Sequence, residues 1–227
     1  MLMFPSPHTE QDLKNWFLDV FMSFFLLDFF HISGYHINCG STEKNTIGGI
    51  GWIPDDALID LGNSSKIDIP GIMPILSSGR YFPDKSAWKY CYVLPVARGA
   101  KYLIRTTYFY GGFDGGKEPP VFDQIIGGTK WSTVNTTDNY AKGLSAYFEI
   151  IMAVPGKTLS VCLARNGQNT SSPFISSLEL EPLEDSMYNP SNFTTDALAT
   201  FARHQFGYEC QILRYGQVLC HKSLIYC

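Results

Sequence analysis

Charged side chains are scarce in this sequence, and their charge is not concentrated anywhere. Asp, Glu, Lys and Arg make up 17% of the 227 residues, and the formal net charge is −4. An average soluble domain has roughly 25% charged residues. No cluster of Lys and Arg occurs along the chain. Because nucleic acids are bound by a concentrated basic surface, we exclude a nucleic acid as the partner.

Motifs typical of catalytic, cofactor and metal sites are also missing. The sequence has no G-x-S-x-G nucleophile elbow. The glycine-rich stretch at 48–51 lacks the Lys-Ser/Thr pair of a phosphate-binding loop. One group of potential zinc ligands has gaps that match no zinc-site spacing: Cys210, Cys220, His221 and Cys227. We therefore predict no enzyme activity, no cofactor and no metal site.

A glycoside hydrolase is the enzyme class that the remaining carboxylates could suggest. Such an enzyme needs two carboxyl groups that face each other across a groove. Glu149, Glu179 and Glu181 alternate with apolar residues, and we expect all three on the solvent face of strands. This expectation leaves a glycoside hydrolase as a minor alternative.

Aromatic and β-branched residues are abundant, and they alternate with polar ones over short runs. Aromatic residues make up 15% of the chain. Period-two alternation occurs at 146–154 and 159–163, on either side of Pro155-Gly156, which resembles a hairpin turn. Short strands separated by Gly, Pro, Asn and Asp predict an all-β, antiparallel β-sandwich. The expected core residues are Phe148, Ile150, Met152, Leu159, Val161, Leu163, Leu178 and Leu180.

A run of aromatic and glycine residues at 108–116 is the best candidate for a ligand site. Carbohydrates are bound by aromatic rings that stack on the apolar face of the sugar, with a few polar groups that set its orientation. The candidate residues are Tyr108, Tyr110, Phe113 and Asp114. The alternative is that these aromatic residues only fill the core, which we expect for Tyr102 and Phe109. Accessibility of Tyr110 and Phe113 distinguishes the two interpretations.

Four N-x-[ST] sequons favour the secretory pathway and an extracellular location. Each lies beside turn-forming residues and should be exposed: Asn63, Asn135, Asn169 and Asn192. Six cysteines permit up to three disulfides, whose connectivity the sequence does not determine. The apolar run at 16–32, after Lys14 and before Ser33-Gly34, resembles a signal peptide.

A long series of motifs resembles the malectin-like domain of plant receptor-like kinases, particularly the leucine-rich-repeat ones. The series covers about 34–207 and includes 38–40, 51–55, 82–83, 91–92, 104–115, 120–123, 127–134, 149–151, 161–163 and 173–183. Gly112 and Phe113 stand where the family usually has Asn and Tyr. The resemblance implies a malectin or jelly-roll-like β-sandwich. Animal malectins bind a glucose oligomer through aromatic residues and an Asp, of which only the strand end at 108–110 can be matched here.

The resemblance also implies a function, partners and a division of the chain. Residues 1–33 are expected to be a signal-peptide-like segment, 34–207 a single first lobe of a truncated tandem, and 208–227 a cysteine-containing tail that is loosely ordered. The lobe is expected to be a non-catalytic extracellular recognition module at the cell surface. Its expected partners are a cell-wall oligosaccharide or a secreted peptide, and other receptor ectodomains. The alternative is a structural lobe that only packs against a second one. Cys39 and Cys91, both within matched motifs, are the candidate disulfide cysteines.

Overall fold

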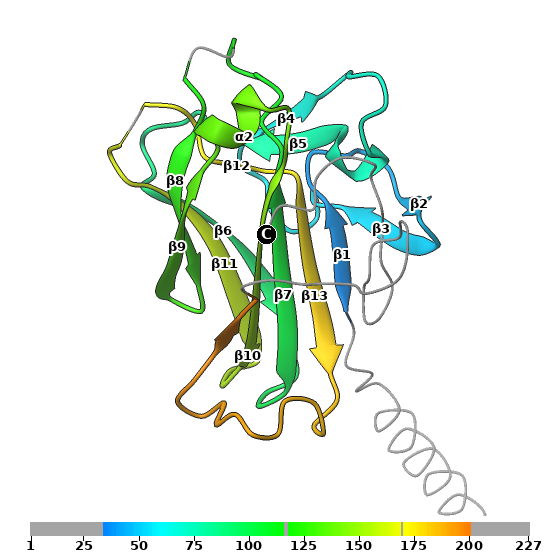
Figure 1. Ribbon diagram of the computed structural model, residues 1–227, viewed down its shortest axis with the longest axis vertical. Helices are drawn as coiled ribbons and strands as arrows, with labels where there is room; N and C mark the ends of the chain where they lie inside the picture. Colours follow the sequence, from blue (N-terminus) through cyan, green and yellow to red (C-terminus); the bar gives the residue numbers. More distant parts are fainter. Residues whose placement is uncertain (1–33, 116–117, 169, 201–227) are drawn as a thin grey trace, which may run out of the picture.

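The strands in the described part of the chain form three sheets. The computed structural model describes residues 34–115, 118–168 and 170–200 (Figure 1). The elements are β1 (Tyr35–Asn38), β2 (Asn45–Ile47), β3 (Ile50–Pro54), β4 (Asn63–Lys66), η1 (Pro74–Leu76), β5 (Ser78–Tyr81), β6 (Lys89–Pro95), β7 (Lys101–Tyr108), β8 (Val121–Ile126), β9 (Thr129–Asn135), α2 (Thr137–Ala141), β10 (Ala146–Ala153), β11 (Thr158–Arg165), β12 (Phe174–Ile175), β13 (Ser177–Leu183) and β14 (Leu198–Ala199). The predicted all-β class is confirmed.

Two of the sheets supply the layers of the sandwich. The larger has the strand order β14-β10-β7-β13-β1-β3-β2, and the smaller has the order β6-β11-β8-β9. The third sheet, β12-β5-β4, lies at one end of the sandwich beside α2 (Figure 1). Strands β8 and β9 are joined at Gly127 and Gly128, which both have positive φ, as a tight hairpin turn requires.

The inward faces of the two main sheets meet in one apolar core, as the alternation predicts. The expected core residues Ile150, Leu159, Val161, Leu163, Leu178 and Leu180 are all buried. Phe148 and Met152 are half-buried and pack against the same cluster. Tyr102 and Phe109 are buried too, so the prediction that they fill the interior is confirmed.

Two details of strand pairing differ from the expectation. The sandwich is not entirely antiparallel, because β1 and β3 pair in parallel. The turn at Pro155-Gly156 does not close a hairpin, since β10 pairs with β7 and β14 whereas β11 pairs with β6 and β8. Alternation shows only that each of the two strands has one buried face. Two strands of one hairpin have such a face, and so do two consecutive strands that lie in opposite sheets of a sandwich. The turn therefore links the two layers.

Some expectations concern segments outside the described residues. The signal-peptide-like segment at 1–33 and the tail at 208–227 both lie there. Over the parts of the chain that the structure describes, no helix has the length and apolar character needed to cross a membrane.

Candidate functional site

The aromatic run at the end of β7 lies mostly inside the protein. Tyr108 is 1% exposed and Tyr110 is 3% exposed. The Tyr108 ring contacts the edges of Phe122, Phe148 and Phe174, and burial raises the pKa of its hydroxyl. These two tyrosines therefore do not offer a ring face to a sugar, which contradicts their prediction as ligand-binding residues.

Phe113 and Asp114, in the loop after β7, remain partly or fully accessible. The Phe113 ring stacks on Tyr81, with centroids 4.4 Å apart. Asp114 is exposed and accepts a hydrogen bond from the Tyr110 hydroxyl. The loop is shaped by glycines, since Gly112 has φ of 74° and a Cβ on Gly111 would lie 2.6 Å from Ile67.

Segments distant in sequence pack against Tyr110 and the loop that follows it. Tyr140 of α2 is 39% exposed, and its ring lies 4.8 Å from that of Tyr110. Tyr81 comes from β5. We call the accessible group Tyr81, Phe113, Asp114 and Tyr140 the strand-end patch. Tyr81 and Tyr140 could not be predicted as part of this patch, because no motif or spacing in the sequence links them to 108–116.

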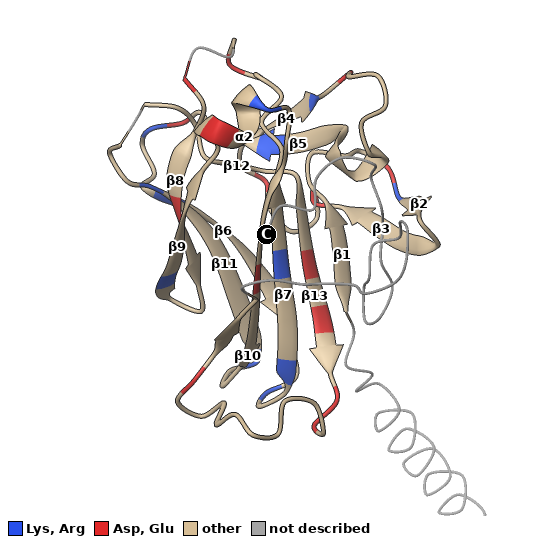
Figure 2. Ribbon diagram, viewed as in Figure 1, with Lys and Arg blue, Asp and Glu red and all other residues tan. Residues whose placement is uncertain are grey.

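The outer face of the larger sheet carries an ion-pair row. Arg105 of β7 lies in register with Glu149 of β10 on one side and Glu179 of β13 on the other. The guanidinium Nε is 2.5 Å from Glu149, and Nη1 is 3.0 Å from Glu179. Figure 2 shows this arrangement as a blue band on β7 beside red bands on β13. Burial alone would lower the pKa of Arg105, but the two carboxylates raise it.

Burial of these glutamates corrects the expectation that they are solvent-exposed. Glu149 and Glu179 are 5% and 6% exposed, and Glu181, which contacts His36, is half-buried. Their position on the outer face is as expected, but each is paired across neighbouring strands. Carboxylates held by one guanidinium between them do not form the facing pair that a glycoside hydrolase needs.

A second ionic cluster lies in the interior and joins four segments. Asp55 has no exposed surface, and its carboxylate oxygens lie 2.6 and 2.7 Å from the Arg80 guanidinium. The same carboxylate accepts hydrogen bonds from the Gly40 N–H, at 2.9 Å, and the Tyr92 hydroxyl, at 2.8 Å. Hydrogen bonding to Asp55 raises the pKa of Arg80, and burial raises that of Tyr92. The cluster fixes the loop after β3 against β5 and β6.

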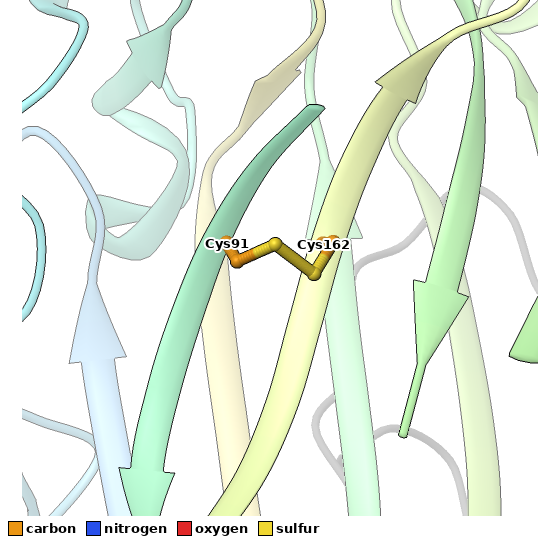
Figure 3. Close-up of a disulfide and its surroundings, with 2 residues drawn as sticks. All are labelled: Cys91 and Cys162. Carbon is orange, nitrogen blue, oxygen red and sulfur yellow. A yellow bond between two sulfur atoms is a disulfide. The ribbon is translucent and has the colours of Figure 1, made fainter. Parts of the chain in front are cut away.

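Among the described residues, a disulfide joins one of the two candidate cysteines to a cysteine that was not a candidate. Cys91 is bonded to Cys162, which lies opposite it on the neighbouring strand β11 (Figure 3). Cys39 is a free, fully buried thiol beside Asp55 and Tyr92, and burial raises its pKa. Of the two candidates, Cys91 therefore lies in a disulfide and Cys39 does not. Adjacent antiparallel strands place Cys91 and Cys162 with their Cα atoms 4.0 Å apart, close enough for a bridge.

The sequon asparagines are accessible wherever the structure describes them. Asn63 begins β4, Asn135 ends β9, and Asn192 lies in the loop between β13 and β14. All three are exposed. Asn169 lies outside the described residues. The exposure of the three is what a glycan acceptor requires.

Within the described ranges, no group of three or more His, Cys, Asp or Glu side chains is arranged to hold a metal ion.

Comparisons with known proteins agree with one another. The sequence model of the malectin-like domain family matches residues 37–217, which extends past the expected boundary at 207. The receptor-like protein kinase At3g21340 of Arabidopsis thaliana is 34% identical over 188 residues, which are 79% of this chain and 20% of that protein. The leucine-rich repeat receptor-like serine/threonine-protein kinase At2g14510, from the same plant, is 36% identical over 138 residues, 61% of this chain and 15% of its own length.

Solved structures resemble the fold at lower sequence identity. The plant receptor-like kinase FER superposes with a TM-score of 0.63 at 18% identity, over 75% of this chain and 48% of FER. A structure of the plant peptide RALF23 in complex with FER and LLG2 gives a TM-score of 0.53 at 18% identity, over 67% of this chain and 40% of the matched chain. The chain thus spans a fifth or less of these curated relatives and under half of these solved chains.

Proposed function

The chain belongs to the malectin-like domain family, and we propose that it is a non-catalytic extracellular recognition module that binds a secreted peptide or protein. The related curated proteins are receptor-like kinases, which supports a role in recognition at the cell surface. The disulfide and the exposed sequon asparagines support the secretory pathway and an extracellular location.

The burial of Tyr108 and Tyr110 is the observation that favours a peptide over a cell-wall oligosaccharide. A sugar site needs accessible ring faces, and the rings at the end of β7 are enclosed by Phe122, Phe148 and Phe174. The solved complex of FER with RALF23 and LLG2 supplies a precedent for a peptide and a protein partner in a related fold. The protein partners that we propose for this chain include other receptor ectodomains.

Binding to immobilised chain tests this proposal. We expect the chain, secreted from plant cells and purified, to capture a peptide from fractionated secreted peptides with a Kd of about 1 μM or lower. A glycan array probed with the same protein should remain at background. Capture is read by biolayer interferometry and the peptide is identified by mass spectrometry. Binding to an oligosaccharide on the array, with no peptide captured, would contradict the proposal.

The strand-end patch is where a carbohydrate would bind if the array gave a signal. Phe113, half-buried, and the exposed Asp114 supply one apolar and one polar group there. Phe113→Ala and Asp114→Asn would then each reduce the array signal. Thr46→Ala, at an exposed position in the distant strand β2, is the matched control and should leave it unchanged.

The sequons give a second expected result. We predict that Asn63, Asn135, Asn169 and Asn192 carry N-linked glycans on protein secreted from plant cells. Glycosidase treatment in heavy-isotope water followed by peptide mapping should mark each acceptor asparagine. Ser65→Ala, which removes the first sequon without changing Asn63, is the control. Two or more unmodified sites on secreted protein would contradict the prediction.

The alternative is that the lobe has no ligand of its own and packs against a second lobe. The observation that favours it is the length of the solved FER chain, of which this chain covers 48%. In that case the purified chain would capture no peptide, and a separately expressed neighbouring lobe from a relative would bind it instead.

A further inference from the structure

Strand β6 is a free edge of the smaller sheet. The sheet order is β6-β11-β8-β9, and β11 is the one strand that pairs with β6 over the described part of the chain. At seven residues, β6 is long for an edge strand. Edge strands present a row of backbone N–H and C=O groups that another chain can pair with, and most proteins shorten, cover or bend them.

The hydrogen bonds at the ends of β6 show which of its residues point their backbone groups outward. The Arg165 N–H donates to the Trp88 carbonyl at 3.1 Å, and the Val96 N–H donates to the Lys157 carbonyl at 2.9 Å. Even-numbered residues of β6 are therefore the ones bonded to β11, because bonded and non-bonded pairs alternate in an antiparallel ladder.

By the same alternation, the odd-numbered residues direct their backbone groups away from β11. The N–H groups of Lys89, Cys91 and Val93 point to the free edge, together with their carbonyls. Pro95, which has no N–H, ends the strand. Since the Cys91–Cys162 disulfide ties the middle of β6 to β11, this row of donors and acceptors is held in an extended conformation.

The middle of this edge carries one exposed apolar side chain, and basic side chains lie near both ends. Val93, inside β6, is 51% exposed, and Trp88, which immediately precedes the strand, is 67% exposed. Lys89 lies at one end of β6, with Arg98 and Lys157 beside the other. All three cations are exposed, and none has an ion-pair partner among the described residues.

Two other free edges each carry a sequon, whereas β6 has none. Asn63 is the first residue of β4, which is the edge of the three-stranded sheet. Asn135 is the last residue of β9, which is the opposite edge of the same sheet as β6. A glycan at either asparagine would hinder an approaching strand, so β6 is the long edge that stays open in a glycosylated chain.

We propose that the free edge of β6 accepts an extended segment of a protein partner as an additional antiparallel strand, with acidic residues at the ends of that segment. The inference rests on the proposed peptide- or protein-binding function and assigns it a surface. Main-chain hydrogen bonds to Lys89, Cys91 and Val93 give the affinity, and alternate side chains of the partner segment lie beside Val93. A second copy of the chain fits less well, because antiparallel pairing of two β6 strands would bring together the basic groups at both ends.

The test uses a defined probe and residue-specific hydrogen exchange. The probe is a ten-residue capped peptide of alternating Val and Thr with two Glu at each end, and its control is the same peptide N-methylated at alternate residues. In the whole glycosylated chain, the amides of Lys89, Cys91 and Val93 should exchange quickly without the probe. With the probe at roughly millimolar concentration, we expect the exchange of these three amides to slow at least tenfold. The N-methylated peptide at the same concentration should leave their exchange unchanged.

Substitutions at Val93 separate backbone pairing from a side-chain effect. Val93→Pro removes an outward N–H that makes no bond to β11, so the fold should persist while probe binding falls at least tenfold. Val93→Thr keeps the N–H and the branched side chain and should retain the binding. Unchanged binding by Val93→Pro would overturn the proposal, as would no protection by the probe. Protection that appears without the probe and grows with protein concentration would overturn it in favour of a second copy.

The same variants distinguish failure of this inference from failure of the proposed function. If unmodified chain and Val93→Pro capture a secreted peptide equally well, the recognition function stands and β6 is not its site. If unmodified chain captures no secreted peptide, the proposed function fails, whatever the probe does at β6.

Discussion

Replacing Arg80 with methionine is expected to lower the free energy of unfolding by about 3–5 kcal/mol. The substitution leaves the Asp55 carboxylate, which has no exposed surface, without the two guanidinium bonds at 2.6 and 2.7 Å. The remaining donors are the Gly40 N–H and the Tyr92 hydroxyl, and neither carries a positive charge. Urea unfolding followed by far-ultraviolet circular dichroism measures the change.

Asp56 supplies the matched control for this substitution. Its carboxylate also contacts Arg80, but its side chain is 59% exposed. Ion pairs in contact with solvent contribute at most about 1 kcal/mol, so Asp56→Asn should have a small effect. The double variant Asp55→Leu/Arg80→Met removes both buried charges and should recover part of the stability that Arg80→Met loses. Equal effects of Arg80→Met and Asp56→Asn would show that the buried pair has no special role.

The faces of the strands could be predicted from the sequence, but their partners could not. Ile150 and Leu159 each follow a period-two pattern, which places an apolar side chain on the buried face whatever the neighbouring strand. The turn between them is short and contains Gly156, so a hairpin and a crossing between layers look the same in sequence. Which of the two forms depends on β7 and β6, the strands that compete for β10 and β11.

The candidate site was predicted less well, because burial there depends on residues far away in sequence. In the sequence, Tyr110 ends a run of strand-forming residues and precedes a glycine-rich stretch, which is typical of an exposed position. It is enclosed by Phe113 in its own loop, Tyr140 of α2 and Phe174 of β12. Similarly, alternation predicts the outer face for Glu179 correctly, but its pairing with Arg105 requires knowledge of the β13–β7 register.

The ionic cluster at Asp55 shows the same limit. Asp55, Arg80 and Tyr92 come from three segments with no common spacing or motif, and Arg80 lies in a strand whose sequence shows no clear alternation. Buried charges have to be paired, yet sequence gives no sign of which charged residues are buried. The free-edge assignment of β6 likewise needs the strand order.

Removing the disulfide is expected to have an effect of similar size. In the chain-entropy account, a bridge between residues 71 apart in sequence restricts the unfolded chain by about 4 kcal/mol. The double variant Cys91→Ala/Cys162→Ala should therefore lose about 4 kcal/mol of unfolding free energy. Cys91 is half-buried and Cys162 is 3% exposed, so the lost packing of the Cys162 sulfur adds to this loss. Urea midpoints with and without a reducing agent measure the effect.

The other cysteines have to be controlled for, because thiols released in an oxidising medium form new bridges. The comparison is best made in a background in which Cys210, Cys220 and Cys227 are alanine, with Cys39 left in place as a buried thiol. In that background the reducing agent should destabilise the parent chain and leave the double variant unchanged. A reducing agent that lowers the midpoint of both proteins equally would mean that the effect does not come from the Cys91–Cys162 bridge. A loss below about 1 kcal/mol in the double variant would show that the bridge does not restrict the unfolded chain as its loop length requires.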